Sequence, residues 1–408
     1  MAPLLGRRVV LGVCGGIAAY KAVEVCRRLV DAGAVVTPVM TTDALRFLGP
    51  ATLSALASEK VQTSLWSEAD PIPHTALGRA ADLVLVAPAT ARLLGRYAAG
   101  IADDLLTATL LATRAPVLLA PAMHAEMWDH PATRANVTVL TARGVGFVGP
   151  VDGRLAGGDE GPGRLADPDA IVAAAEAALT PADLAGRTVL VTAGGTREPV
   201  DAVRFLANRS SGRQGHAVAA EAAARGAAVV LVTTADPGPV PAAVEVVRVD
   251  TAAEMEAAVL GRSPSADVVV MAAAVADFRP KAPATGKLPK SEGPPEIVLE
   301  PTVDILAELG RRKRPGQVLV GFAAETVSGD GLRARGAEKR AAKNLDLIVA
   351  NDVSAEGAGF GHETNRALLL DSGGSCQDVP LVPKRVLAGL VLDIVARRLD
   401  GTIERETR

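Results

Sequence analysis

The sequence predicts an α/β protein made of two Rossmann-like domains, each with a parallel sheet between two helical layers. Three observations support this prediction. The chain has 408 residues, which is more than one hydrophobic core usually organises. Short runs rich in Val and Leu alternate with Ala-rich helical patterns in both halves, as they do in doubly wound parallel sheets. Each half also opens with a strand-like run that ends in a glycine pair, Gly15-Gly16 and Gly194-Gly195.

The strand-like runs fall into two sets. The first set covers residues 8–13, 34–40, 81–87 and 116–120, and the second covers residues 188–192, 227–233, 244–249, 267–272, 317–322 and 346–350. Between the two sets lie a segment dense in Gly and Pro (149–163), a helical pattern (167–179) and a polar segment (180–186). We therefore place a boundary near residue 185, which gives domains 1–185 and 186–408.

Composition and charge narrow the class of ligand. The chain has 43 Lys and Arg against 46 Asp and Glu, and its formal net charge of -3 provides no basic field for nucleic acid or an anionic membrane. We therefore expect small-molecule ligands. The longest apolar stretches, such as 268–276, are too short for a membrane helix, and the N-terminus lacks a signal-peptide pattern. Three scattered cysteines, Cys14, Cys26 and Cys376, favour a reducing compartment, so we expect a cytoplasmic protein.

The glycine pairs allow two interpretations. At the carboxyl end of a parallel strand, glycines let backbone N–H groups approach a phosphate, and a helix N-terminus adds a favourable dipole. A tight turn from strand to helix explains a glycine pair equally well. Neither loop contains the G-x-G-x-x-G fingerprint, and this absence argues against a nicotinamide-dependent dehydrogenase. Neighbouring motifs must decide between the two interpretations.

Several separated motifs of the first half provide that context. They are residues 14–21 (CGGIAAYK), 40–41 (MT), 87–90 (APAT), 100–105 (GIADDL) and 121–123 (PAM). With these motifs, residues 5–165 resemble the homo-oligomeric flavin-containing cysteine decarboxylases. The resemblance implies a flavodoxin-like flavoprotein domain that forms trimers. It also implies that FMN is bound by a set of residues in the strand-end loops: Gly15, Gly16, Ile17, Ala18, Thr41, Pro88, Ala89 and Thr90.

The resemblance also assigns catalytic positions. A lone His in a loop is more often a packing residue, but the catalytic His of the family occupies the place of His74, and an imidazole titrates near neutral pH. His124 stands where the family often has Asn, and it can still donate a hydrogen bond to a carboxylate. Gly157 stands where the substrate clamp, here residues 153–164, often carries a proton-donating Cys. The last reduction step then needs another acid or water.

The chemistry of the family explains why a decarboxylation needs a flavin. Loss of carbon dioxide from a cysteine carboxylate leaves a carbanion, and oxidation of the thiol to a thioaldehyde creates an electron sink beside it. The flavin supplies this oxidising power, and the protein is left with orientation and proton handling. Loss of the clamp Cys keeps an alternative open, in which the first half is a non-catalytic FMN-binding scaffold or regulatory subunit.

The second half contains a long polar loop after its glycine pair. Residues 196–212 separate Gly195 from the next helical pattern, and the loop ends in Ser210-Ser211-Gly212. A loop of this length that opens onto a helix N-terminus is a candidate anion site, although a simple helix cap is possible. Further motifs follow at residues 273–278, 287–290, 321–326 and 339–346. Lysines on separate loops that meet at one sheet edge suit a triphosphate, whereas each lysine alone would be a solvated surface residue.

Together these motifs resemble the phosphopantothenate-cysteine ligases over residues 187–400. The order of the two halves resembles the bacterial bifunctional proteins that carry this ligase after the decarboxylase. The resemblance implies dimers through this half, and substrates 4'-phosphopantothenate, L-cysteine and CTP with Mg²⁺, whose protein ligands the sequence does not reveal. CTP would convert the carboxylate into an acyl-cytidylate that the amine of cysteine attacks.

The resemblance also implies a role for each matching residue. Asp277 and Phe322 hold the cytidine, Lys287, Lys339 and Lys343 face the phosphates, and Asn208 and Arg204 handle the acyl-cytidylate. Asn208 and Lys287 are the predicted catalytic residues. Lys290 falls in a lysine-containing loop that Pro289 interrupts. The remaining implied substrate-binding residues are Ala273, Val303 and Asp304.

Overall fold

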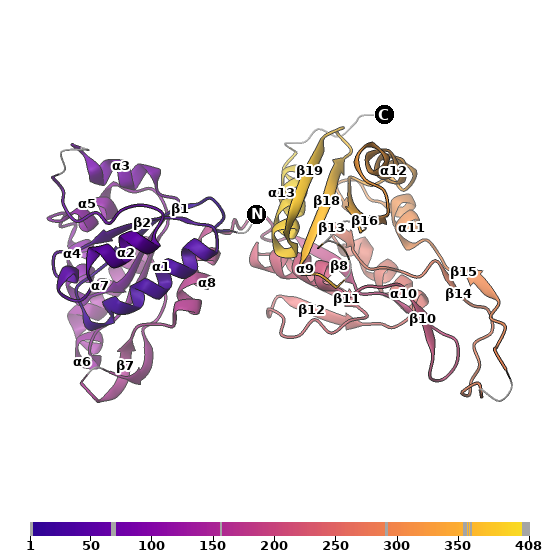
Figure 1. Cartoon of the computed structure of the whole chain (residues 1–408), viewed down its shortest axis with the longest axis horizontal. Helices are drawn as coiled ribbons and strands as arrows, with labels where there is room; N and C mark the ends of the chain where they lie inside the picture. Colours follow the sequence, from indigo (N-terminus) through magenta and orange to yellow (C-terminus); the bar gives the residue numbers. More distant parts are fainter. Residues whose placement is uncertain are drawn as a thin grey trace. The chain divides into compact units, whose positions relative to one another are not determined.

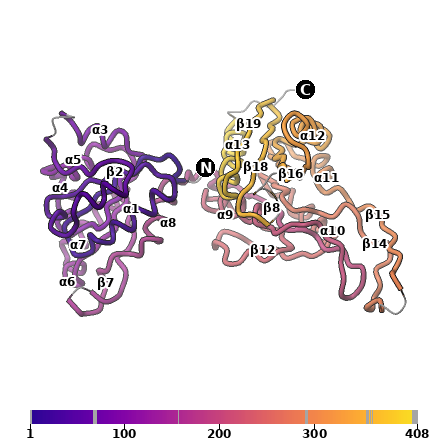
Figure 2. Tube along the Cα trace, in the orientation of Figure 1, coloured from indigo at the N-terminus to yellow at the C-terminus, as the bar shows by residue number. Residues whose placement is uncertain are grey.

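The computed structural model divides the chain into two compact units. They are an N-terminal unit, Ala2–Pro181, and a C-terminal unit, Ala182–Arg408. The residues that the structure describes are 3–66, 71–155, 157–289, 293–353, 357, 359 and 361–401. Each unit has its own sheet and its own cores, and each is described separately (Figures 1 and 2).

A five-stranded parallel sheet forms the centre of the N-terminal unit. Its strand order is β2-β1-β3-β4-β5, which is the flavodoxin-like order. The strands form because β-branched and Leu residues occupy both faces, and all seven residues of β3 are buried. Their bounds are β1 Arg8–Val13, β2 Val35–Met40, β3 Leu83–Ala89, β4 Val117–Pro121 and β5 Gly146–Phe147.

Helices cover both faces of this sheet. Alternate residues of β1 point to opposite cores: Val9 and Leu11 pack with α1 and α8, whereas Val10 packs with α4, α5 and α7. The predicted three-layer arrangement is therefore confirmed. The helices are α1 Ala22–Asp31, α2 Pro50–Leu56, α3 Pro73–Ala80, α4 Ala91–Ala99, α5 Leu105–Ala112, α6 Ala125–Asp129, α7 Pro131–Ala142 and α8 Pro168–Leu179, with 3₁₀ turns Ile17–Lys21 and Ala44–Arg46.

An antiparallel hairpin lies outside this sheet. It consists of β6 (Val151–Arg154) and β7 (Glu160–Arg164) and covers the predicted clamp. Gly163 has a φ of 141°, and a Cβ there would lie 2.1 Å from the Met123 carbonyl oxygen. The Met123 N–H also donates a hydrogen bond to the Gly163 carbonyl at 3.0 Å. The hairpin is thus held against the chain that follows β4.

The C-terminal unit has an eight-stranded sheet of order β12-β11-β8-β13-β16-β17-β18-β19. The first six strands are parallel and have the Rossmann order, and the last two are antiparallel. The two antiparallel strands were not predicted. The bounds are β8 Thr188–Ala193, β11 Ala228–Thr233, β12 Val244–Arg248, β13 Val268–Met271, β16 Val318–Glu325, β17 Leu347–Asp352, β18 Thr364–Asp371 and β19 Cys376–Pro383.

Helices again cover both faces of the sheet. One core lies under α9 and α13, and the other lies under α10 and α11. Two short antiparallel pairs, β9–β10 and β14–β15, lie outside the main sheet, and the tubes of Figure 2 show β14 and β15 in the extended segment ahead of α11. The bounds are α9 Arg213–Ala224, α10 Ala252–Arg262, α11 Ile305–Arg312, α12 Gly329–Ala342, α13 Lys384–Leu399, β9 Arg197–Pro199, β10 Phe205–Ala207, β14 Phe278–Pro280, β15 Leu299–Pro301 and a 3₁₀ turn Ser263–Ser265.

Both sheets reverse their strand order next to the strand that precedes a glycine pair. In the N-terminal unit the reversal lies between β1 and β3, and in the C-terminal unit it lies between β8 and β13. Ligands of doubly wound sheets bind in the crevice outside the carboxyl ends of the strands at such a point. Within the described part of the chain, no helix combines the length and the apolar character that a bilayer crossing needs.

Candidate functional site

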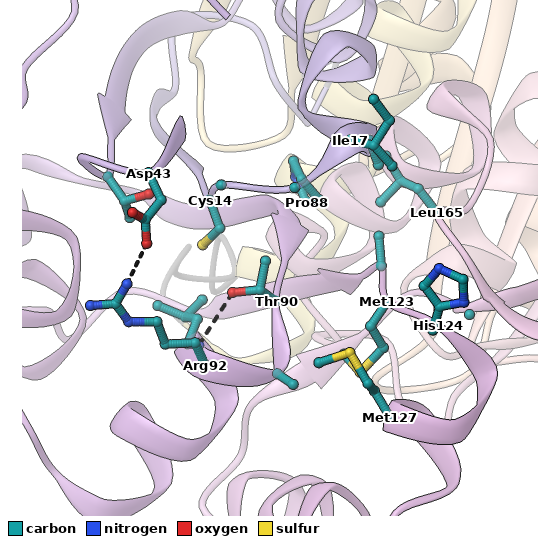
Figure 3. A pocket seen from close by; sticks show the side chains of 18 of the residues that line it. Cys14, Ile17, Asp43, Pro88, Thr90, Arg92, Met123, His124, Met127 and Leu165 are labelled. Atoms are coloured by element: carbon teal, nitrogen blue, oxygen red, sulfur yellow. Dashed lines mark hydrogen bonds and ion pairs between the residues drawn. The ribbon is translucent and has the colours of Figure 1, made fainter. Parts of the chain in front are cut away.

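A cavity of about 1060 Å³ lies at the strand-order reversal of the N-terminal unit (Figure 3). Loops after β1, β2, β3 and β4 line it together with the β6–β7 hairpin. Of the residues predicted to bind the cofactor, all but Ala89 line this cavity. Ala89 is fully buried in β3. The lining residues among them are Gly15, Gly16, Ile17, Ala18, Thr41, Pro88 and Thr90.

Gly15 is required by a close approach between two loops. A Cβ at this position would lie 2.3 Å from the Cβ of Asp43 and 2.6 Å from its carbonyl carbon, so no larger residue fits without a backbone shift. Asp43 in turn forms an ion pair with Arg92, which also lines the cavity (Figure 3). The loop after β1 is thereby pressed against the loop after β2.

Thr90 and Cys14 both line the cavity. The Thr90 side chain caps α4 by accepting a hydrogen bond from the Leu93 N–H at 3.4 Å. Cys14 is buried, and burial raises the pKa of its thiol to about 12. Cys14 is therefore a neutral thiol near pH 7 and a very weak acid.

The predicted motif at residues 100–105 supplies a cap and an ion-pair network. Asp104 caps α5 by a reciprocal capping box with Thr107. Arg96 reaches both acids of the motif, with Nη2 2.7 Å from Asp103 Oδ2 and Nη1 3.3 Å from Asp104 Oδ2. All three charged residues line the cavity. The motif thus holds α5 in place and supplies charge beside the ligand space.

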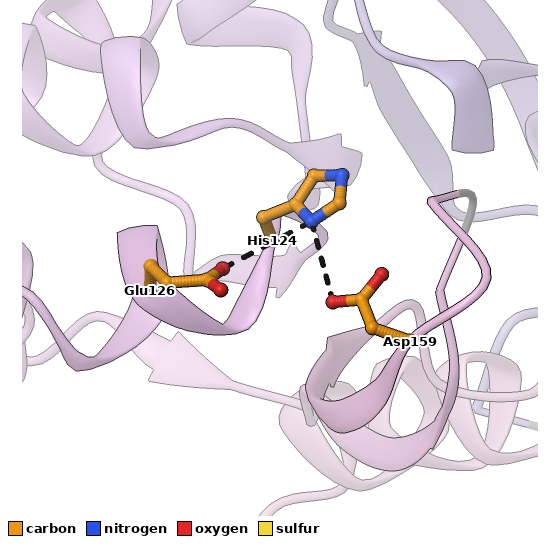
Figure 4. A group of neighbouring side chains, drawn as sticks. All are labelled: His124, Glu126 and Asp159. Carbon is orange, nitrogen blue, oxygen red and sulfur yellow. Dashed lines mark ion pairs between the residues drawn. The ribbon is translucent and has the colours of Figure 1, made fainter.

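His124 stands at the mouth of the cavity between α6 and the hairpin. It lines the cavity, and its side chain is 49% exposed. Its Nδ1 atom lies 3.7 Å from Asp159 Oδ2 and 4.0 Å from Glu126 Oε2, so that two carboxylates face one edge of the ring (Figure 4). The opposite edge, which carries Nε2, is not occupied by these acids.

His74 occupies a different place. It lies in the first turn of α3, and it is not among the described residues that line the cavity. Its Nδ1 atom is buried and has no hydrogen-bond partner within the described part of the chain. Ile72, just before the helix, and Leu111 on the neighbouring α5 are exposed apolar side chains.

In the C-terminal unit, the segments that follow β8 and β13 are hydrogen-bonded to each other. The Ala274 N–H donates to the Gly194 carbonyl at 2.8 Å, and the Ala276 N–H donates to Thr196 Oγ1 at 2.9 Å. The side chain of Asn208 donates to the Val275 carbonyl at 3.0 Å. The predicted segments 194–196, 208 and 273–277 are therefore brought together at one point of the sheet edge.

Asp201 organises the loop around Arg204. Its side chain is fully buried, and it accepts hydrogen bonds from Arg204 Nε at 2.8 Å and from the Leu288 N–H at 3.2 Å. Arg204 also donates to the Leu288 carbonyl at 2.9 Å. The hydrogen bonds from Arg204 hold the pKa of Asp201 well below its usual range. This arrangement fixes the segment that carries the exposed Lys287.

Two further predicted lysines, Lys339 and Lys343, are paired with acids. Lys343 Nζ lies 2.7 Å from Asp304 Oδ2, and Lys339 Nζ lies 2.6 Å from Glu325 Oε1. Burial alone would raise the pKa of Glu325, but hydrogen bonds from Lys339 and Arg335 outweigh it, so the pKa is lowered. Burial of Asp304 is outweighed in the same way by Lys343, and its pKa is also lowered.

Two of the remaining predicted residues, Val303 and Phe322, lie near the 273–277 segment or the end of β13. Thr302 joins Val303 to the 273–277 segment, because its N–H donates to the Asp277 carbonyl at 2.9 Å. Phe322 lies on β16 one residue beyond Gly321, which pairs with Met271 at the end of β13. Lys290 lies outside the described residues.

The sequence prediction did not include several residues of these sites. Asp43, Arg92 and Arg96 line the cavity, and Asp201 and Glu325 hold predicted cations. The sequence points to such residues only by their closeness to predicted ones. Asp43 follows the predicted Thr41 by two residues, and Asp201 precedes the predicted Arg204 by three. Which cation each acid would meet depends on the fold.

The fold and the cavity define a flavoprotein domain joined to a second doubly wound domain. The Flavoprotein family matches residues 2–180, and the "DNA/pantothenate metabolism flavoprotein C-terminal domain" family matches residues 184–399. The chain is 50% identical over 410 residues to the coenzyme A biosynthesis bifunctional protein CoaBC of Mycobacterium tuberculosis (strain ATCC 25618 / H37Rv), with 97% of each chain covered. It is 45% identical over 412 residues to the protein of the same name from Bacillus subtilis (strain 168), with 98% of this chain and 100% of that protein covered.

Among solved structures, the C-terminal domain of a coenzyme A biosynthesis bifunctional protein CoaBC is 37% identical, with a TM-score of 0.45, and covers 53% of this chain and 98% of that one. On the full-length identities, the chain belongs to the family of bifunctional proteins of coenzyme A biosynthesis. The prediction of a bifunctional enzyme with a flavoprotein decarboxylase domain and a ligase domain is thereby confirmed.

Proposed function

We propose that the chain ligates L-cysteine to 4'-phosphopantothenate with CTP in its C-terminal unit, and decarboxylates the product to 4'-phosphopantetheine with FMN in its N-terminal unit. The single observation that carries the proposal is the cavity of about 1060 Å³, which gathers seven of the eight residues predicted to bind FMN. Ordinary ligand pockets measure about 300 to 1000 Å³, so a flavin mononucleotide and part of a substrate fit. The free cysteines Cys14, Cys26 and Cys376 suit the reducing cytoplasm.

The residues around the cavity fit FMN in chemical terms. Gly15 and Gly16 follow β1 at the strand-order reversal and line the cavity, and backbone N–H groups of such a loop can approach a phosphate. The apolar Ile17 and Pro88 and the thioether of Met123 provide contacts for a flat ring. When bound, FMN supplies the oxidising power that takes a hydride from the substrate and later gives it back.

The other residues of the cavity act on the substrate. Residues of the β6–β7 hairpin line the cavity, where they would help to keep water from the reacting carbons of a bound substrate. Arg154 and Arg164 of the hairpin line the same space and suit the anionic groups of phosphopantothenoylcysteine. Loss of carbon dioxide follows oxidation of the thiol to a thioaldehyde, because the thioaldehyde accepts the electrons that the departing carboxylate leaves behind.

The C-terminal unit supports activation of a carboxylate. Asn208 is held beside the 273–277 segment and can position an acyl group through its amide, whereas Lys287 projects from the segment fixed by Asp201 and suits a departing pyrophosphate. Lys339 and Lys343 lie on the same side, and Mg²⁺ would share the charge of the triphosphate. Asp277 and Phe322 are the proposed cytidine contacts.

His74 can take the proposed role in proton handling only if an assembly brings it to a cavity. The decarboxylase resemblance implies trimers and the ligase resemblance implies dimers, and the exposed Ile72 and Leu111 near His74 suit burial against a second copy. We expect His74→Asn to keep the yellow colour of bound FMN and to stop release of carbon dioxide. Mixed oligomers of His74→Asn and Gly15→Ala chains, each inactive alone, should then regain decarboxylation. No regain would show that His74 does not act on the cavity of another copy.

The full chain tests the proposal directly. Purified protein with 4'-phosphopantothenate, cysteine, CTP and Mg²⁺ should form phosphopantothenoylcysteine and then 4'-phosphopantetheine, followed by mass spectrometry. CTP should be consumed to CMP and pyrophosphate. Ligation without any release of carbon dioxide would contradict the decarboxylase assignment and would favour an N-terminal unit that binds FMN as a scaffold, for which the missing clamp Cys at Gly157 is the motive.

A further inference from the structure

The last step of the decarboxylation needs an acid. This inference rests on the proposed function, in which loss of carbon dioxide leaves an enethiol. Conversion of the enethiol to the thiol product adds one hydride and one proton across its carbon–carbon double bond. The hydride is the one that the flavin removed from the same substrate, so the electrons balance without an outside reductant. The proton must come from a group at the cavity, and Gly157 has no side chain that could supply it.

Most described residues that line the cavity are poor candidates. Cys14 is buried, and its pKa of about 12 makes it a weak acid. Asp43 is paired with Arg92, and Asp103 and Asp104 are paired with Arg96. Tyr20 and Lys21 lie in the turn after Gly16, at the end of the cavity proposed for the FMN phosphate. Guanidinium groups do not release protons near neutral pH, whereas an imidazole does. Among the described lining residues, His124 is the one imidazole.

The geometry of His124 suits a proton donor. Two carboxylates, Glu126 and Asp159, face its Nδ1 edge at 4.0 Å and 3.7 Å, so they hold the orientation of the ring from that edge. Figure 4 shows both acids on the Nδ1 side of the ring, with Nε2 on the other side. The ring also stands between the start of α6 and Asp159 of the β6–β7 hairpin, two elements that border the cavity.

A side chain at residue 157 would come into close contact with the ring of His124. A Cβ built on Gly157 would lie 3.0 Å from His124 Cε1, 3.7 Å from His124 Nε2 and 2.7 Å from Asp159 Oδ1. A side chain at residue 157 would therefore project to the Cε1–Nε2 edge of the ring. In this chain the imidazole borders the space that a side chain at residue 157 would enter.

We propose that His124, oriented by Asp159, donates the proton that completes reduction of the enethiol, in place of a donor at residue 157. The Nε2–H bond breaks as a C–H bond forms on the substrate, and the imidazole regains its proton from water after the product leaves. The proposal assigns His124 a chemical role, in contrast to the carboxylate anchor that its alignment with Asn implies.

The first test is His124→Asn in the full chain. We expect FMN to bind with unchanged affinity and carbon dioxide to be released, while formation of 4'-phosphopantetheine falls about a hundredfold, as is typical for loss of a general acid. The enethiol should accumulate in quenched samples, and the flavin absorbance should stay bleached after one turnover. The matched control is His130→Asn, an exposed His outside the cavity that should behave like the unmodified chain.

The second test is rescue. His124→Asn removes the ring that a side chain at residue 157 would meet, so the double variant His124→Asn/Gly157→Cys places a thiol at the vacated position and should restore most product formation. Gly157→Cys alone, which keeps His124, should form product more slowly than the unmodified chain, because its Cβ meets the His124 ring and Asp159. Product formation by His124→Asn at the original rate, or failure of both carbon dioxide release and product formation together, would overturn the proposal. Absence of carbon dioxide release from the unmodified chain would instead overturn the proposed function.

Discussion

Arg225 connects three parts of the C-terminal unit, and its substitution provides a quantitative test of the packing. Its side chain is 2% exposed, and it lies 2.5 Å from Asp393, 3.1 Å from Glu221 and 3.4 Å from Asp183. It also donates to the Gly389 carbonyl at 3.2 Å. One guanidinium group thus joins the end of α9, the middle of α13 and the segment where the unit begins. We expect Arg225→Met to destabilise this unit and to leave the other unit intact.

The expected size follows from burial. Removal of one partner of a buried ion pair costs about 3 to 5 kcal/mol, because it leaves charge without its counter-charge in a poorly solvated site. The three acids retain exposed fractions of 14% to 35%, so water can partly solvate them after the substitution. The lower end of the range, about 3 kcal/mol, is therefore expected. For a domain of this size it corresponds to a fall in Tm of about 6 to 12 °C.

Two optical signals separate the units. Both tryptophans, Trp66 and Trp128, lie in the N-terminal unit, so tryptophan fluorescence follows that unit, whereas far-ultraviolet circular dichroism follows both. Arg225→Met should lower one dichroism transition and leave the fluorescence transition in place. The control is Arg279→Met, which removes an exposed pair with Glu300 and should shift Tm by at most about 2 to 4 °C. Equal shifts for the two variants, or a shift in fluorescence, would refute the reasoning.

Three further perturbations test the sites. Gly15→Ala should abolish the yellow colour of bound FMN without loss of dichroism, because its Cβ would lie 2.3 Å from that of Asp43, whereas Gly49→Ala, which meets nothing within 4 Å, should bind FMN normally. Asp201→Asn should lower kcat/KM for ligation about tenfold or more in a pyrophosphate-release assay, since it weakens the contacts that fix residues 287 and 288. An unchanged kcat/KM would show that Asp201 does not support the ligation site. The pKa of Glu325 is lower in the folded protein than its value of 4.5 in the unfolded chain. The ionised carboxylate therefore stabilises the folded state above pH 4.5, and this stability is lost as the pH falls through the folded-state pKa. Urea titrations of Glu325→Gln should therefore show a weaker acid dependence than those of the unmodified chain, and parallel curves would contradict this.

The parallel strands of both units could be predicted from the sequence, because strands buried on two faces are continuous apolar runs. The run at 8–13 is β1, and that at 188–192 lies within β8. The antiparallel strands β18 and β19 were missed for the same physical reason. The first half of β18 alternates between buried and more exposed residues, and β19 is largely exposed, so neither produces a continuous run.

The sites show a similar division. Residues in strand-end loops, such as Thr41 and Thr90, could be predicted because the fold brings all such loops to one edge, and the cavity contains them. The ion pairs of Arg92 and Lys343 could not be predicted from the sequence. Their partner acids are 49 and 39 positions away, and only the tertiary structure brings each pair together. The position of His74 outside the cavity lining was also not predicted, because its role came from a resemblance that carries no geometry.

The pairing of cations with acids bears on how phosphates would bind. A triphosphate that recruits Lys343 must replace Asp304, whose side chain is 51% exposed and can be solvated by water once the lysine leaves. Recruitment of Lys339 would instead take one of the two cations from Glu325, which is 5% exposed and would keep Arg335 alone. On the proposed ligase function, we therefore expect Lys343 to move to a phosphate at a lower cost than Lys339. The burial of the acid, rather than the position of the lysine in the sequence, decides which cation is free to follow the ligand.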